Sequence, residues 1–123
     1  MKSEIKSKSA PAPVGPYSQA VDAGAIYCAG QIGTDPSTGE LVQGVVAQTA
    51  RAIANLEGVL SAAGLSLKDV VKTTVFMLDL SEYSAMNEEY AKHFNAPYPA
   101  RSTVQAAALP RGAKFEIDAI AVR

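Results

Sequence analysis

The chain has 123 residues, of which 48% are hydrophobic, and its formal net charge is −1. This length and hydrophobicity exclude a disordered chain and predict a single domain over residues 1–123, with only residues 1–9 as a loose end. The near-zero charge gives no electrostatic basis for binding nucleic acid, because Glu4 interrupts the few lysines near the N-terminus.

The single cysteine, Cys28, and the single histidine, His93, limit the possible chemistry further. One cysteine can form neither an intrachain disulfide nor a cysteine-based zinc cluster, and one histidine excludes a metal site built on a histidine pair. No apolar run approaches the ~20 residues of a membrane-spanning helix or resembles a signal peptide. We therefore expect a cytoplasmic protein with no membrane partner.

The first part of the chain predicts short strands joined by turns. Three prolines and a glycine rule out a helix in the lead-in, and Asp22-Ala23-Gly24 offers a turn. In chain order we expect an irregular lead-in over residues 9–16, strands over 17–21 and 26–32, a turn over 35–39 and a short extended piece over 40–42.

Apolar residues at helical spacing predict two helices further along the chain. Gly64 stands where a glycine commonly follows a helix end, and Pro97 and Pro99 end the second helix. The first stripe comprises Val46, Ile53, Leu56, Leu60 and Ala63, and the second comprises Tyr83, Met86, Tyr90 and Phe94.

Three more strands are expected, over residues 70–80, 101–107 and 115–122. The resulting order, β-β-(β)-α-β-α-β-β, predicts an α+β domain with two helices on one face of a sheet. Apolar residues occur on both faces of the last strand, whereas the helices can cover only one face. We therefore expect a homo-oligomer whose subunit interface covers the other face.

Arg101 is the first candidate for binding a substrate. It enters a strand directly after Pro99-Ala100, and a guanidinium can hold a carboxylate through two parallel hydrogen bonds. The competing interpretation is a surface arginine in a salt bridge, because most arginines are solvated.

Glu116 is the second candidate, since its face of the last strand also carries Ile120 and Val122. A carboxylate on a partly apolar face has a raised pKa and can exchange protons with a substrate or with water. A solubility charge on an edge strand is equally compatible with the sequence, and the neighbouring Asp118 favours that interpretation.

The spacing of the two candidates bears on whether one chain can hold both. If the last two strands form a hairpin around Arg111, Glu116 pairs near Ala106 and Arg101 lies roughly 16 Å away. A site shared by Arg101 and Glu116 would then form across a subunit boundary.

Several other residues have both a ligand-binding and a structural interpretation. The Tyr17 phenol can bond a ligand or fill the core, Gly30 suits either a close ligand approach or a bulge, and Asn87 can simply be solvated. We expect Cys28 to be a small buried hydrophobe and His93 to lie near a helix end, neither of them catalytic.

From about residue 10 to its end, the chain resembles the RidA (YjgF-like) family. The matching segments correspond to the family's N-terminal motif, its Ser-Gly-Gln-Ile segment and its C-terminal signature. They are Ala10–Ala20, Ala29–Ile32, Pro99–Thr103, Leu109-Pro110 and Lys114–Ala121.

This resemblance implies a chorismate-mutase-like α+β fold, with a mixed sheet and two helices on one face, in a homotrimer whose sheets form a central barrel. It implies that sites between subunits hydrolyse 2-imino or enamino acids to 2-keto acids and ammonia, with no metal or cofactor. Arg101 would bind the substrate carboxylate and Glu116 would position or activate water. The implied substrate-binding residues are Tyr17, Ala29, Gly30, Asn87 and Thr103.

Two positions depart from the family pattern: Ala29 replaces a common serine and Thr103 a common cysteine. The alternative function is therefore a regulatory trimer that binds 2-keto acids without turnover. RNA cleavage has been attributed to some relatives, but this sequence has no basic stripe and no RNA-binding motif that would support it. A chorismate mutase would need several cations for its dianionic substrate, and only Arg101 is well placed.

Overall fold

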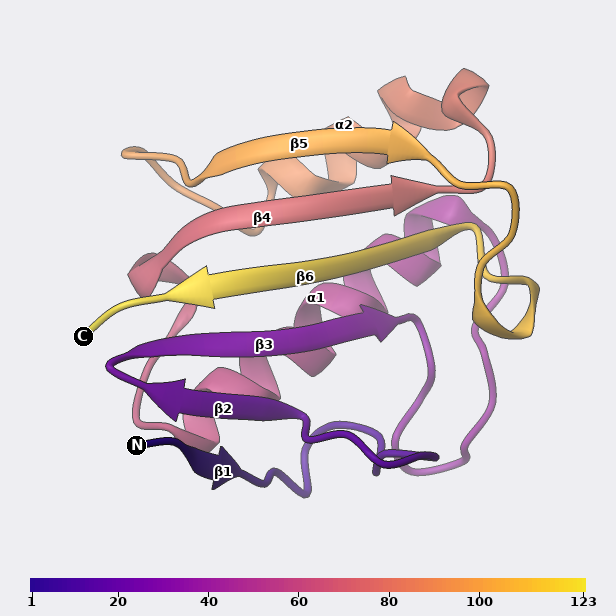
Figure 1. Cartoon of the computed structure of the whole chain (residues 1–123). Helices are drawn as coiled ribbons and strands as arrows, with labels where there is room; N and C mark the ends of the chain where they lie inside the picture. The colour runs from indigo at the N-terminus through magenta and orange to yellow at the C-terminus, as the bar shows by residue number, and fades with distance from the viewer.

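One six-stranded sheet organises the chain in the computed structural model, which describes residues 1–123 (Figure 1). The strands lie in the order β1-β2-β3-β6-β4-β5, and only β4 and β5 run parallel to each other. The sheet is therefore mixed, as expected. Its strands are β1 (Ser3–Ile5), β2 (Ala20–Ala23), β3 (Ala25–Ile32), β4 (Val70–Met77), β5 (Ala100–Gln105) and β6 (Phe115–Ala121).

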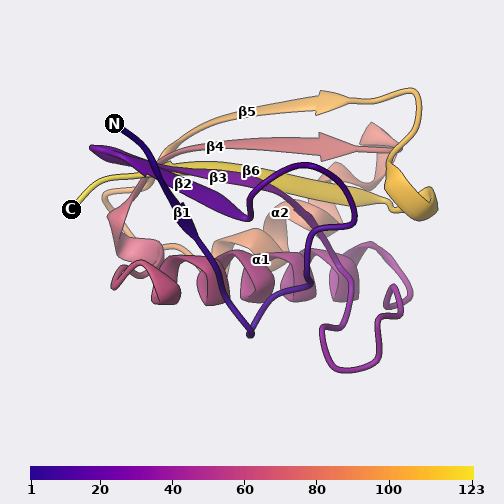
Figure 2. The same cartoon turned by 60° about the horizontal axis from the view of Figure 1, so that its bottom comes forward.

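Two α-helices, α1 (Val45–Ala62) and α2 (Tyr83–Ala91), pack on the same face of this sheet (Figure 2). The expected α+β class with both helices on one face is thus confirmed. No helix is both long enough and apolar enough to cross a membrane. Three short 3-10 segments complete the chain: η1 (Leu67–Asp69), η2 (Leu80–Glu82) and η3 (Pro110–Gly112).

Strand β6 illustrates how the two faces of the sheet differ. Phe115 and Ile117 point towards the helices and are fully buried, because successive side chains of a strand alternate between faces. Glu116, Asp118 and Ile120 point the other way and stay half-exposed. The face that they share carries no helix (Figure 2), so it is available for another molecule.

Several element boundaries differ from the sequence expectation. Residues 3–5 form the edge strand β1 paired with β2, where a loose end was expected. The next strand begins at Ala20 and not at residue 17, and the Tyr17 amide donates to the Gly15 carbonyl in a turn instead. Residues 40–42 form no strand and contribute only an isolated bridge between Thr34 and Leu41.

Two further differences concern α1 and the strand that follows it. Val46 was placed in the buried stripe but is 47% exposed, and Val45, one residue earlier on the helix, is buried instead. The strand expected over residues 70–80 ends at Met77, after which the chain turns through η2 into α2.

The expected hairpin of the last two strands is wrong. Strand β4 lies between β5 and β6, and Glu116 is paired with Phe76 of β4 and Ile32 of β3. A parallel β4–β5 pair requires a crossover connection, and α2 supplies it. The chain then passes back through η3 to place β6 in the middle of the sheet.

Candidate active site

Arg101 lies on β5, the edge strand, and its side chain is held by α2. The Nη2 atom donates hydrogen bonds to the Tyr83 hydroxyl oxygen at 2.6 Å and to the Asn87 Oδ1 atom at 2.8 Å. The guanidinium also lies over the Tyr90 ring, 4.5 Å from its centroid, at a distance typical of a cation–π contact. One helix therefore fixes this cation from three sides.

The charge of Arg101 has no carboxylate partner within the chain. None of the ion pairs of the structure includes it, and its Nε and Nη1 atoms make no hydrogen bond. The interpretation of Arg101 as a surface arginine in a salt bridge is therefore wrong. Because the side chain is half-buried and its protein partners are neutral, it suits the binding of an external anion.

Glu116 lies on β6 and faces the backbone of Gly30 on β3. A methyl group at Gly30 would collide with the Glu116 Oε2 atom. The carboxyl group therefore occupies space that is free only because residue 30 is a glycine. A register shift between Cys28 and Gln31 brings the Gly30 backbone forward as a bulge. Burial, and secondarily the negative charge of Asp118, raises the pKa of Glu116. Proton transfer near neutral pH benefits from that direction of shift.

A cavity of about 340 Å³ opens beside Glu116. Tyr17 and Gly30 also line it, together with residues of the loop that precedes α1 and with Arg111. Tyr17 is half-exposed, and its hydroxyl accepts only a long 3.4 Å bond from the Val14 backbone. Its hydroxyl proton therefore remains available to a ligand in the cavity that the side chain lines.

Arg101 and Glu116 point to opposite faces of the sheet. Arg101 is paired with Thr73 of β4, and Thr73 is paired with Ala119 of β6. The side chains of Thr73 and Ala119 are both buried under the helices, so Arg101 lies on that face as well. Glu116 lies on the uncovered face, and Arg101 does not line its cavity. One chain thus holds two separate groups: the Arg101 group, made of Arg101, Tyr83, Asn87 and Tyr90, and the Glu116 group, made of Glu116, Gly30 and Tyr17.

The remaining sequence candidates fall near one group or the other. Thr103 lies two residues beyond Arg101 on β5 and on the same face. Ala29 lies beside Gly30 on β3, where its amide donates to the Gln19 carbonyl at 2.8 Å, and it does not line the cavity. Asn87 belongs to the Arg101 group and is not a merely solvated side chain.

The sequence reasoning missed the roles of Tyr83 and Tyr90, which it assigned to the apolar stripe of the second helix. Tyr90 is buried, as that stripe requires, and its ring also supports Arg101. Tyr83 is 38% exposed and turns towards Arg101. The only sequence signal for this contact was a tyrosine at the end of an apolar stripe. A phenol combines an apolar ring with a polar hydroxyl, so it can pack in the stripe and still bind a polar group.

Cys28 and His93 take no part in either group. Burial raises the pKa of the Cys28 thiol to about 11, so the reactive thiolate is scarce at neutral pH. His93 pairs with Glu89 one helical turn away, at 2.7 Å. The His, Cys, Asp and Glu side chains nowhere gather in groups of three or more that could hold a metal ion.

Residues 7–123 match the model of a protein family described as Endoribonuclease L-PSP. The chain therefore belongs to this family, the RidA family that its sequence motifs resemble. Protein DfrA of Myxococcus xanthus is 53% identical and covers 96% of this chain and 93% of its own length. The 2-iminobutanoate/2-iminopropanoate deaminase of Mus musculus is 49% identical over 97% of this chain and 90% of its own. The crystal structure of E. coli TdcF with bound serine superposes with a TM-score of 0.93 at 43% identity, covering 98% of each chain.

Proposed function

We propose that this protein hydrolyses small 2-imino acids, such as 2-iminobutanoate and 2-iminopropanoate, to 2-keto acids and ammonia. One observation carries the proposal: the guanidinium of Arg101 is half-buried, held in place and without a carboxylate partner. The mouse relative bears the name of this activity at 49% identity, which supports the same substrate class. The substrate carboxylate would be the negatively charged partner that Arg101 lacks within the chain.

The reaction requires little beyond placement of the reactants. The imine carbon is electrophilic, so a water molecule adds to it and forms a carbinolamine. Loss of ammonia then leaves the ketone of the 2-keto acid. Arg101 holds the carboxylate, and Glu116, whose pKa is raised, orients the water and exchanges protons with it and with the departing amine. No metal or cofactor enters these steps.

We further propose that the working form is a cytoplasmic homotrimer with sites between subunits. Within one chain Arg101 and Glu116 lie on opposite faces of the sheet, so a site using both needs a second copy. The uncovered face carries Tyr27, Phe76 and Ile120, which suit an interface between copies. Thus the Arg101 group of one subunit would meet the Glu116 group of its neighbour.

The first test measures hydrolysis directly. An amino-acid dehydratase generates 2-iminobutanoate in the cuvette, and semicarbazide traps the imine that remains. The protein should reduce the trapped fraction well below the buffer control. Arg101→Ala should lower kcat/KM at least about a hundredfold, because the substrate loses its charge-assisted hydrogen bonds. An Arg101→Ala protein as active as the parent would overturn the proposal. Binding of 2-ketobutanoate without any hydrolysis would favour the regulatory alternative.

The second test asks whether each site is shared between subunits. Arg101→Ala and Glu116→Ala proteins, each inactive alone, are mixed after mild dissociation and reassembled. If each site takes Arg101 from one subunit and Glu116 from another, about a quarter of the sites are intact in the mixture. Reassembled mixtures that remain inactive would exclude the shared site while leaving the hydrolysis test unaffected.

A further inference from the structure

The Tyr83 hydroxyl, in the Arg101 group, retains an unused donor on a partly exposed side chain. Its oxygen accepts a hydrogen bond from the Arg101 Nη2 atom at 2.6 Å, and this is the only hydrogen bond of the side chain. A phenol is both a donor and an acceptor, so its proton remains free. The side chain is 38% exposed, so a ligand on Arg101 can reach that proton.

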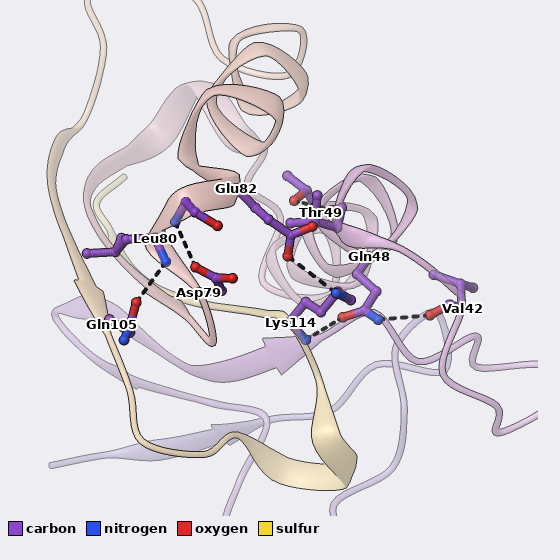
Figure 3. A network of polar contacts seen from close by, with 10 residues as sticks. Val42, Gln48, Thr49, Asp79, Leu80, Glu82, Gln105 and Lys114 are labelled. Carbon is purple, nitrogen blue, oxygen red and sulfur yellow. Dashed lines mark hydrogen bonds and ion pairs between the residues drawn. The ribbon is translucent and has the colours of Figure 1, made fainter.

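The residues before Tyr83 are held from several directions, as Figure 3 shows. The Leu80 amide donates to the Gln105 Oε1 atom of β5 at 2.8 Å, and the Ser81 amide donates to the Asp79 carboxylate at 2.8 Å. Glu82 pairs with the Lys114 ammonium at 3.3 Å. Tyr83, the first residue of α2, therefore follows a segment that is held in place. Its hydroxyl can bind a ligand with little loss of conformational freedom.

Tyr90 makes the assignment more specific, because it is the other tyrosine of the group. Its hydroxyl is hydrogen-bonded to the Thr73 hydroxyl at 2.9 Å, and the side chain is buried. The Tyr90 hydroxyl is thus engaged in the buried interior, while its ring lies under the Arg101 guanidinium. Tyr83 combines a contact to the guanidinium with a free donor on the exposed side.

We propose that the Tyr83 hydroxyl is a second carboxylate-binding group, which donates a hydrogen bond to the same carboxylate that Arg101 holds. The free N–H groups of Arg101 and the free O–H of Tyr83 belong to side chains in direct contact, so one planar carboxylate can meet both. The ligand class is the small 2-keto or 2-imino acid. This assignment rests on the proposed function only in that the ligand carries a carboxylate.

Titration calorimetry with 2-ketobutanoate on the assembled protein tests the contact without requiring turnover. Tyr83→Phe keeps the ring and removes only the hydroxyl, and it should weaken binding about tenfold, as expected for a hydrogen bond to a charged group. Tyr98→Phe is the matched control, because Tyr98 is 67% exposed and makes no side-chain hydrogen bond. It should bind as the parent does. Equal affinities of Tyr83→Phe and parent would overturn the assignment.

A double-mutant cycle separates a direct contact from an effect through Arg101. In the Arg101→Lys protein, titrated by ligand NMR at millimolar 2-ketobutanoate, Tyr83→Phe should still weaken binding severalfold if the hydroxyl meets the carboxylate. If Tyr83→Phe changes nothing in that background, Tyr83 acts only by positioning Arg101 and the direct contact is refuted. A parent protein that binds 2-ketobutanoate but never hydrolyses the imine would refute the proposed function while leaving Tyr83 in place.

Discussion

The two faces of the sheet are completed in different ways. Under the helices, Ile117 and its neighbours are fully buried, so a single chain finishes that core. On the opposite face, which also carries Glu116, Ile120 and Tyr27 are paired with no helix over them. Arg101 belongs to the first face and Glu116 to the second. The helix-covered core is thus complete within one chain, whereas the proposed chemistry needs a second copy.

The largest expected effect is on the helix-covered face. Ile117→Ala leaves a cavity among fully buried side chains, so the unfolding free energy should fall by about 2–5 kcal/mol. Urea unfolding followed by circular dichroism measures the change. A loss below about 1 kcal/mol would mean that this face is not the tightly packed core described above.

Ile120→Asp is the matched change on the other face of the same strand. Because Ile120 is half-exposed in one chain, the fold should survive, with native circular dichroism. A charge introduced into an apolar interface should instead dissociate the assembly, as analytical ultracentrifugation would report. Imine hydrolysis should fall together with the assembled fraction. An Ile120→Asp protein that remains a fully active oligomer would contradict the assignment of this face to the interface.

Local patterns predicted most of the elements that build these two faces. The strand expected over residues 26–32 is β3, and that over 115–122 is β6. The alternation of β6 predicted that Glu116 would share a face with Ile120, as it does, but not which face the helices would cover. Periodicity is a property of neighbouring residues, so a single sequence contains it.

The order in which the strands pair and the contacts of α2 with β5 could not be predicted from local patterns. The sequence favoured a hairpin of the last two strands because they are adjacent, whereas β4 separates them. Tyr83 was grouped with apolar residues because its spacing is helical, although its hydroxyl contacts Arg101 on β5. Both features depend on residues far apart in the chain, which no local pattern reports.

A pair of glycines extends the comparison from folding to chemistry. A methyl group at Gly30 would displace the Glu116 carboxyl, a flexible end that can move, whereas one at Gly33 would lie 2.7 Å from the Gln48 Cα atom of α1. Gly30→Ala should therefore lower kcat about 10- to 100-fold with little loss of stability. Gly33→Ala should lower the unfolding free energy by about 1–3 kcal/mol. Kinetics and thermal melts of the two proteins, measured side by side, test this division. Equal kcat values for Gly30→Ala and parent would remove Glu116 from the mechanism.

The smallest expected effects concern the charge on Glu116. Burial and Asp118 raise its pKa above the ordinary 4.5, so the folded state binds this proton more tightly than the unfolded state. That contribution to stability is present below the unfolded pKa and is lost as pH rises through the folded pKa. Glu116→Gln should therefore raise the melting temperature relative to the parent at pH 7, and the difference should vanish near pH 4. A parent that is as stable as Glu116→Gln at both pH values would mean that the carboxyl is not perturbed.

Asp118→Asn provides the finest distinction, because it alters the charge beside Glu116 without touching either group of site residues. Removing the negative charge should lower the pKa of Glu116, though burial, the larger cause, remains. If Glu116 must be ionised to exchange protons with water, the acid limb of the kcat profile should move to lower pH in Asp118→Asn, with kcat at pH 8 unchanged. A profile that stays in place would assign the acid limb to another group. Burial and, secondarily, the charge of Asp118 also raise the pKa of the Cys28 thiol, but that pKa lies at about 11 and gives no acid limb. A shift of the acid limb to lower pH would therefore assign the proton chemistry to Glu116, and with it to the uncovered face of the sheet.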